Sequence, residues 1–318
     1  MDIRSALLGS KLRIAGTVLL VLAVGVAAAY FGGVIGVPQV ESMENSFGTV
    51  NESTTVIETN VTVNNPNPIG ISLGGVSLNY TVDMNEVRMA SGDKTGISIG
   101  TGNSTVTLTT LMDNSQIPKW WVSHIRNGEQ TTVDVRATVT SSLLGQSYTT
   151  SLPGRTINTD LLSSFNSTET RAVNANHPIV SDPVAYINET SASWGQVTQS
   201  ETPTKMAFVV YNPKSYPITV SELGYNVTMA GVDMGDGATQ DPVVIQPHSA
   251  ETIRANVVID NTNLDRWWVE HLQNGQSSTL RITFYARASV GGQTIRLPLD
   301  AFTHEEQIET DIFGGSGA

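Results

Sequence analysis

Apolar and polar residues alternate along most of the chain, and the pattern occurs twice, with the copies 147 positions apart as Trp120 and Trp267 mark. A period of two is typical of a half-buried β-strand. Because corresponding positions keep their phase without a net gap, the pattern predicts two copies of one antiparallel β-sandwich. The clearest pair of runs places these residues inward: Ile57, Thr59, Val61 and Val63, then Thr204, Met206, Phe208 and Val210.

Four more pairs of runs repeat the alternation. We therefore expect an all-β fold, with a first sandwich over residues 38–165, a linker over 166–183, a second sandwich over 184–312 and a flexible tail over 313–318. The expected inward positions are Val76, Leu78, Tyr80, Val82 and Met84 with Leu223, Tyr225, Val227 and Met229; Val106, Leu108 and Met112 with Ile253, Ala255 and Ile259; Val133, Val135 and Val139 with Leu280, Ile282 and Ala286; and Tyr148, Thr150 and Leu152 with Ile295, Leu297 and Leu299.

One stretch in each copy departs from the period of two. Its apolar residues lie four apart, at Ile117, Trp121 and Ile125 and at Leu264, Trp268 and Leu272, which predicts a short helix with one buried stripe. We expect Trp120 and Trp267, about 100° around the helix, to contribute less to the core. The expected helix ends are Asn114 or Ser115 with Pro118 and then Asn127-Gly128, and Asn261 or Thr262 and then Asn274-Gly275.

The chain begins with a basic segment and a long apolar run. Residues 14–37 carry no charge and are long enough to span a bilayer core of about 30 Å. The basic residues Arg4, Lys11 and Arg13 precede this run, so the positive-inside rule places residues 1–13 in the cytoplasm and everything after Pro38 outside. A cleaved signal peptide ending near Ala27-Ala28-Ala29 is the competing interpretation, but the run continues past a usual signal core.

Composition narrows the possible partners and chemistry. The net charge of −12 disfavours nucleic acid and anionic headgroups, so no nucleic-acid partner is expected. The chain has no cysteine, which excludes disulfides, thiolate metal sites and a cysteine nucleophile. An acidic, Lys-poor, Thr-rich composition is typical of a salt-adapted, halophilic archaeal source and also of an ordinary exported protein, and both interpretations stay open.

The residues after the first strand of each copy resemble a known family. Asn65-Pro66-Asn67, the Gly-rich turn and strand that follow it, and a late strand pair after the helix are similar to the late embryogenesis abundant group 2 proteins and their WHy domain (water stress and hypersensitive response). The second copy has Asn212-Pro213-Lys214 and departs from this motif at its third position. The resemblance implies seven-stranded immunoglobulin-like or fibronectin III-like sandwiches with one helix each, and a non-enzymatic role in tolerating drying, salt or cold.

Three patterns are candidates for chemistry, and each has a simpler structural interpretation. Gly96-Ile97-Ser98-Ile99-Gly100 matches a nucleophile elbow, but no helix pattern follows it. His124 and His271 recur at corresponding positions, which favours a structural hydrogen bond over a metal ligand. Asp233, Asp236 and Asp241 flank two glycines in a stretch where calcium binding stays open, although a solvated acidic loop is favoured. We therefore predict no catalytic residue, cofactor or resident metal.

Sequons provide a possible modification signal. Two of them, at Asn79 and Asn226, are equivalent positions on the outward phase of a strand, where an exported chain can be glycosylated. Seven N-x-S/T sequons occur in all, at Asn51, Asn60, Asn79, Asn103, Asn166, Asn188 and Asn226.

Two functions remain after these considerations. The first is a membrane-tethered, extracytoplasmic protein that protects the envelope during water or salt stress, with the lipid bilayer as partner through residues 14–37. The second is an envelope module of adhesin or surface-layer type that binds an unknown protein or glycan outside the membrane.

Overall fold

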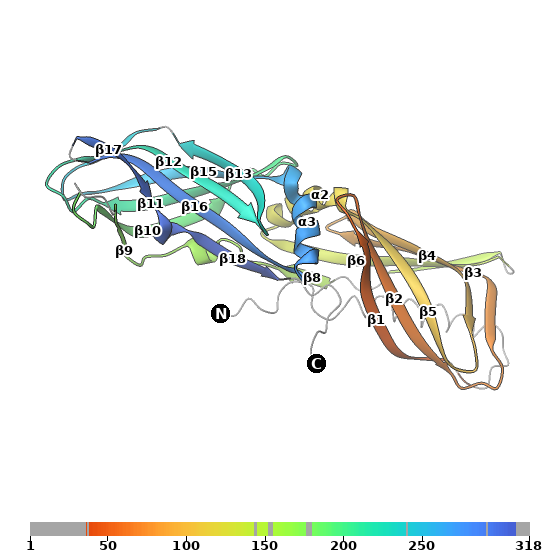
Figure 1. Ribbon diagram of the computed structural model, residues 1–318. Helices are drawn as coiled ribbons and strands as arrows, with labels where there is room; N and C mark the ends of the chain where they lie inside the picture. The colour runs from red at the N-terminus through yellow and green to blue at the C-terminus, as the bar shows by residue number, and fades with distance from the viewer. Residues whose placement is uncertain are drawn as a thin grey trace. The chain divides into compact units, whose positions relative to one another are not determined.

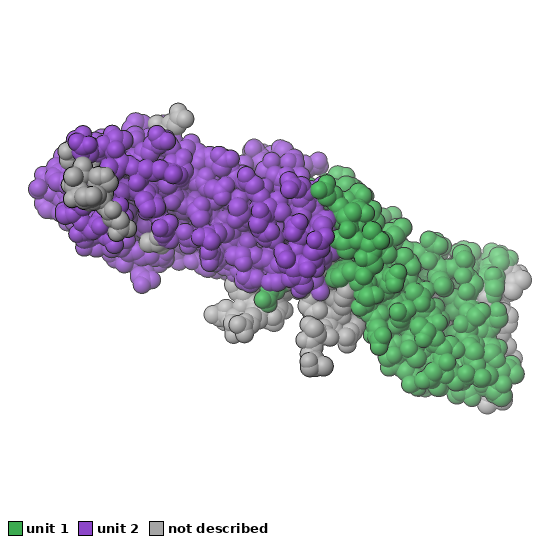
Figure 2. Space-filling view, viewed as in Figure 1, with its two compact units in different colours: residues 1–159, 309–318 green, residues 160–308 purple. Residues whose placement is uncertain are grey.

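The computed structural model describes residues 36, 38–142, 145–151, 155–175, 180–239, 241–290 and 292–309. The described chain is mostly β, every strand pairing in it is antiparallel, and two short α-helices interrupt the strands. It divides into two compact units, residues 1–159 with 309–318 and residues 160–308 (Figure 2). The prediction of a mainly antiparallel β protein with two short helices is therefore confirmed.

Unit 1 forms one bent sheet with two branches. Strands β1-β2-β5 make one branch and β4-β3-β6-β7 the other, with β8 also on β6; four residue pairs between β4 and β5, from Ala90 with Met112 to Asp93 with Thr109, connect them. Side chains buried almost completely come from both branches. The strands are β1 (Gln39–Val50), β2 (Thr54–Asn65), β3 (Ile71–Met84), β4 (Val87–Ile99), β5 (Gly102–Asp113), β6 (Gln130–Ser141), β7 (Gln146–Ser151) and β8 (Arg155–Asn158).

Unit 2 connects its strands in the corresponding order but keeps two sheets. The orders are β15-β11-β10-β9 and β13-β12-β16-β17, with β14 on β12 and β18 on β16. Phe208 of one sheet meets Phe284 of the other with ring centroids 5.2 Å apart, so the sheets pack face to face. The strands are β9 (Arg171–Val173), β10 (Ala185–Trp194), β11 (Glu201–Tyr211), β12 (Ile218–Met229), β13 (Val232–Thr239), β14 (Val243–Ile245), β15 (Ala250–Asp260), β16 (Ser277–Val290), β17 (Gln293–Pro298) and β18 (His304–Glu309).

In each unit a tyrosine hydroxyl forms a hydrogen bond between the two groups of strands, which are the two branches of unit 1 and the two sheets of unit 2. In unit 1, Tyr80 Oη lies 2.6 Å from Thr110 Oγ1. A Cβ at Gly92 would lie 2.7 Å from the Thr109 carbonyl oxygen, so only glycine lets β4 approach β5 closely enough to pair. In unit 2, Tyr225 Oη accepts the Val258 N–H at 3.1 Å, and β13 and β15 do not pair.

The inward phase predicted from the alternation is buried or half-buried in almost every run, but it is wrong at Tyr148, which is 56% exposed. Leu297, which pairs with Ala286 on β16 as Tyr148 pairs with Val139 on β6, is buried and lines a cavity together with Val173 of β9. Among the described residues of unit 1, no strand corresponds to β9. The described part of unit 1 therefore has no strand at the place that β9 takes beside Leu297.

The two predicted helices form at α2 (Ile117–Arg126) and α3 (Leu264–Gln273), each after a 3₁₀ turn, η1 (Asn114–Gln116) and η3 (Asn261–Asn263). Figure 1 shows each helix at one end of its own unit's sheets. The caps differ from the prediction. Asp113 and Asp260, one residue earlier than expected, accept the N–H groups of Ser115 and Thr262. Asn114 and Asn261 are instead fully buried.

The expected linker contributes to unit 2. The short turn η2 (Ser163–Phe165) precedes it, and Phe165 packs edge-on against Phe208 in the core. Strand β9 then pairs with β10. The boundary between the units accordingly follows Thr159, before residues 166–183.

Apart from Gly36, the predicted membrane span over residues 14–37 lies outside the described residues, as does the tail over 313–318. Within the described ranges, neither α-helix has the length or the apolar character needed to cross a bilayer.

Candidate functional site

A buried chain of hydrogen bonds fixes α2 to the sheet of unit 1. Trp120 Nε1 donates to Thr131 Oγ1 at 3.0 Å, and His124 Nδ1 lies 2.8 Å from the same hydroxyl. His124 Nε2 lies 2.8 Å from Thr159 Oγ1, whose hydroxyl donates to the Glu129 carboxylate at 2.9 Å. The chain therefore runs from an indole on the helix to a carboxylate in the turn that follows it.

The direction of these bonds assigns the tautomer of His124. Because the Thr159 hydroxyl donates to Glu129, it accepts from His124, so Nε2 carries the proton. Nδ1 then accepts from Thr131, whose oxygen accepts from Trp120. Every donor has one acceptor only if the imidazole is neutral.

Unit 2 repeats the first half of this network. Trp267 Nε1 donates to Ser278 Oγ at 3.0 Å, and His271 Nδ1 lies 2.6 Å from that oxygen. The position equivalent to Thr159 is Glu306, which is buried and accepts a hydrogen bond from Ser164 at 2.8 Å. Burial lowers the pKa of His124 to about 4 and that of His271 to about 4. Both rings are therefore neutral at ordinary pH.

The arrangement is suited to holding a helix rather than to reacting with a substrate. His124 and His271 are 2% and 0% exposed, so no solvent-borne group reaches them. Across the ranges described, no three His, Asp or Glu side chains gather as a metal site would require. The geometry agrees with the structural interpretation of the two histidines.

The paired tryptophans differ between the units. Trp121 and Trp268 are buried, as the stripe predicted. Trp120 is half-buried, but Trp267 is 3% exposed and contacts the His271 ring with centroids 5.3 Å apart. The expectation that Trp267 contributes little to the core is therefore wrong.

Glycines, rather than the asparagines before them, turn the chain after each helix. Gly128 and Gly275 have φ of 71° and 70°, in the left-handed region. Asn127 and Asn274 have φ of −86° and −85° and stay outside that region. Their N–H groups instead close the last helical turn, onto Ser123 O and Glu270 O.

The asparagine that opens each Asn-Pro motif is buried and joins neighbouring loop segments through side-chain hydrogen bonds. Asn65 Nδ2 donates to the carbonyls of Ile69 and Gly100, and its Oδ1 accepts from the Asn67 amide. Asn212 does the same with Tyr216, Ile245 and Lys214. The prolines Pro66 and Pro213 follow outside the ladder, where a missing N–H costs nothing.

The third residue of each motif holds the segment that leads into the first long strand of its sheet, β1 in unit 1 and β10 in unit 2. Asn67 accepts the Gly36 N–H and donates to the Gly36 carbonyl, both at 2.8 Å. In unit 2, Lys214 Nζ donates to the carbonyl and the hydroxyl oxygen of Ser181 at 2.6 and 2.9 Å. Lys214, which replaces the Asn of the family motif, therefore also holds the preceding segment by hydrogen bonds, with an ammonium group in place of an amide as the donor.

The remaining candidates from the sequence do not assemble into reactive sites. Ser98 lies within strand β4, 3.5 Å from Ser72 across the ladder, and Gly100 begins a strand-to-strand turn rather than the strand-to-helix turn of a nucleophile elbow. Asp233 and Asp236 lie on strand β13 and not in the expected acidic loop, and the Asp233 carboxylate accepts the Gly235 N–H. Asn79 and Asn226 are both exposed on central strands, accessible to modification.

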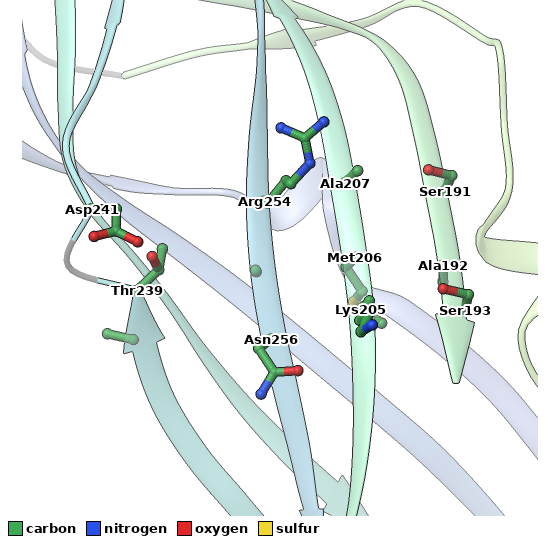
Figure 3. Close-up of a pocket in the computed structure, with 12 residues that line it drawn as sticks. Ser191, Ala192, Ser193, Lys205, Met206, Ala207, Thr239, Asp241, Arg254 and Asn256 are labelled. Carbon is green, nitrogen blue, oxygen red and sulfur yellow. The ribbon is translucent and has the colours of Figure 1, made fainter. Parts of the chain in front are cut away.

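An open cleft of about 820 Å³ lies on unit 2 (Figure 3). Its floor is the outward face of β10, β11 and β15, with Lys205 beside Asn256 and Arg254 beside Ala207 in register. The Lys205 and Arg254 side chains form no ion pair or hydrogen bond with the described part of the chain. Two cations among small, hydroxyl-bearing residues can bind an anionic, polar ligand. The other lining residues are Ser191, Ala192, Ser193, Met206, Ala238, Thr239, Asp241 and Ala255.

Sequence reasoning missed this cleft. The alternation places Lys205 and Arg254 on the outward phase of their strands, but they are 49 positions apart. Only the pairing of β11 with β15 brings them to one surface.

The fold and the buried hydrogen-bond networks define the structural class of this protein. This is a modular β protein of two compact units, each with one short helix held at its end by a Trp–His–hydroxyl network. The late embryogenesis abundant protein family model matches residues 60–151, in unit 1, and 207–301, in unit 2. These segments are more than half of the sequence, so the chain belongs to the late embryogenesis abundant protein family.

Individual relatives agree in sequence over parts of the chain. An uncharacterised protein of Methanocaldococcus jannaschii is 34% identical over 102 residues, which are 31% of this chain and 59% of that protein. A crystal structure of a protein from Archaeoglobus fulgidus is 30% identical, covers 39% of this chain and 98% of that chain, and has a TM-score of 0.37. A solution structure of a protein from Arabidopsis thaliana is 17% identical, covers 44% of this chain and 95% of that chain, and has a TM-score of 0.29. With TM-scores below 0.5, the assignment rests on the family model.

Proposed function

We propose that this chain is a membrane-anchored, extracytoplasmic, non-enzymatic protein that protects the cell envelope or its proteins during water or salt stress. The observation that carries the proposal is the family match in both units. Units 1 and 2 are, in this proposal, two tandem WHy domains, each an immunoglobulin-like or fibronectin III-like sandwich with one helix. The corresponding strand orders of the two units support this.

The membrane anchor is proposed from the sequence. The uncharged run over residues 14–37 follows three basic residues and precedes Glu41 and Glu44. An anchor in that place leaves both units outside the cytoplasm. In an oxidising environment a chain without cysteine undergoes no thiol oxidation. Glycans at Asn79 and Asn226 belong to the same proposal.

A deletion strain tests the protective function. We expect loss of viability after drying or an osmotic shift, and normal growth otherwise. As a direct assay, a labile enzyme is dried with the purified protein or with an equal mass of an unrelated β-sandwich. Equal recovery of enzyme activity in the two mixtures, together with normal survival of the deletion strain, would contradict the protective role.

The cleft on unit 2 favours a second candidate function, an envelope interaction module. Its unpaired Lys205 and Arg254 are suited to a carboxylate-bearing glycan or protein segment. If this function is the principal one, Lys205→Gln with Arg254→Gln reproduces the deletion phenotype, and that phenotype is altered attachment or envelope assembly. The matched control is Arg136→Gln, an exposed cation on β6 of unit 1.

A further inference from the structure

The loops at the end of unit 1 that receives the chain from the apolar run carry no charge, and the nearest charge on the adjoining strand β1 is Glu41. Gly36 is held there by Asn67, so this residue of the run lies against the loop after β2. Asn65 ties that loop to the β4–β5 turn through the carbonyls of Ile69 and Gly100. Ser142 N–H, in the β6–β7 connection, bonds to Gly75 O beside the start of β3. The uncharged end of unit 1 is formed by the loop 66–70, the turn 100–102 and the hairpin flanks Ser141 and Gln146.

The absence of charge extends over three separate stretches. No Asp, Glu, Lys, Arg or His occurs in residues 59–82, 95–112 or 137–154, although the chain carries a net charge of −12. Each of the three equivalent stretches of unit 2, 147 positions later, contains charged residues, among them Lys214, Glu251, Arg287 and Arg296. The two units share a strand order, so the fold does not require an uncharged end.

Three large apolar side chains are exposed on these stretches: Leu111 lies toward the α2 end of β5, and the other two lie toward the uncharged end. Ile69, on the loop held next to Gly36, is 70% exposed, and Tyr148, two residues beyond Gln146 on β7, is 56% exposed. Tyrosine is favoured at membrane interfaces, where its ring meets the apolar boundary and its hydroxyl stays hydrated. An acidic surface elsewhere on the protein is repelled by anionic headgroups, whereas an uncharged end can approach neutral ones.

We infer that the uncharged end of unit 1 docks on the bilayer in which residues 14–37 are anchored, with Ile69 in the interfacial region of a neutral lipid surface. The inference rests on the membrane anchor of the proposed function. It specifies which surface of unit 1 the lipid covers and leaves the opposite end, with α2, away from the membrane.

The absence of cysteine permits a site-specific test in the full chain. Ile69→Cys, labelled with an environment-sensitive fluorophore, is reconstituted in phosphatidylcholine vesicles that contain a nitroxide-labelled lipid. The control is Thr49→Cys, exposed near the α2 end of unit 1. We expect the label at position 69 to lose most of its fluorescence and the label at position 49 to lose little. Equal quenching at the two positions overturns the inference.

A second pair of variants tests whether Ile69 holds the contact. With the label at Tyr148→Cys, Ile69→Asp is expected to abolish quenching, because a carboxylate is expelled from the interface. Val244→Asp, at an exposed apolar residue of unit 2, is expected to leave quenching unchanged. Equal effects of the two aspartates contradict the docking. Vesicle flotation separates the two proposals: a chain that does not float with the lipid refutes the anchor and the docking together, and one that floats without selective quenching refutes the docking alone.

Discussion

At the scale of single residues, the two histidines show how burial turns a titratable group into a structural one. His124 is neutral because burial lowers its pKa, and its two ring nitrogens complete a one-directional series of hydrogen bonds from Trp120 to Glu129. The recurrence of His at position 271 identified the pair from the sequence. The partners could not be identified, because Thr131 and Thr159 are brought to the ring by strands β6 and β8.

The networks predict a loss of stability in acid. The pKa of His124 and of His271 is about 4 in the folded protein, below the ordinary value of 6.5. The unfolded chain therefore binds protons more tightly, and stability present above pH 6.5 is lost as the pH falls toward 4. The loss is about 3 kcal/mol per histidine. Urea unfolding across this range measures it. His124→Gln should flatten the profile of unit 1, whereas His248→Gln, at an exposed histidine, should not.

The tryptophans predict an asymmetry between the units. Trp121→Ala and Trp268→Ala should each lower the free energy of unfolding by about 3–5 kcal/mol, because each empties a core position. Trp267→Ala should cost about as much, since its ring is buried and its N–H is bonded to Ser278. Trp120→Ala should cost less, because its ring is half-buried. Thermal unfolding of the four variants measures these differences, and equal losses for Trp120→Ala and Trp267→Ala would contradict the described burial.

At the scale of elements, alternation predicted the strands because a half-buried strand must repeat every second residue. The caps could not be predicted in the same way. Asp113 and Asn114 can both cap a helix, and the choice is made by Thr55, whose hydroxyl donates to the buried Asn114 at 3.1 Å. Tyr148 fits the alternation equally well, yet the described part of unit 1 places no strand over it. Long-range partners decided both cases.

Substitutions in the Asn-Pro loop of unit 1 should separate an effect on the free energy of unfolding from an effect on local hydrogen exchange. Asn65→Ala should destabilise unit 1 by about 2–4 kcal/mol, since it leaves two carbonyls and one N–H without their partner. Asn67→Ala should change unfolding less but accelerate hydrogen exchange at the Gly36 amide, because its acceptor is removed. Lys214→Ala, which loosens Ser181 in unit 2, is the control. Exchange at Gly36 that is equally fast in both variants would show that Asn67 does not hold this segment.

At the scale of the whole molecule, the repeat predicted two copies of one fold, and the strand orders agree with it. The repeat did not reveal that unit 1 closes β4 onto β5 while unit 2 leaves β13 and β15 apart. A glycine alone does not decide this difference, because both hairpins have one at the same place: Gly92 pairs with Tyr80, and Gly237 pairs with Tyr225. One glycine in an alternating run is a weak signal until its neighbour strand is known.

The two units should unfold separately. Each has its own core and its own helix network, so calorimetry should resolve two transitions, and Trp121→Ala should lower only one of them. Trp268→Ala should lower the other. A single transition displaced by both variants would show that the units unfold as one body.

The orientation of the chain can be tested in intact cells. Protease added outside should remove residues beyond Pro38 and leave residues 1–13 protected, because the basic flank stays in the cytoplasm. A mature chain that begins near Tyr30 would indicate signal cleavage instead. Protection of both Trp-Trp segments in cells with an accessible surface would reverse the orientation.

The path of the chain through unit 1 has a mechanical consequence. The chain comes in beside Gly36 and Asn67 at one end and leaves at Thr159 beside Glu129, at the α2 end. Tension between a tether before Gly36 and anything attached beyond Thr159 therefore acts along the strands. Strand β1 is paired with β2 from Gln39 to Val50, so the load falls on many ladder bonds at once, in shear, and they do not open one after another. Strand β1 therefore resists such tension along its whole length, whereas β8 at the other end is held by four residue pairs to β6.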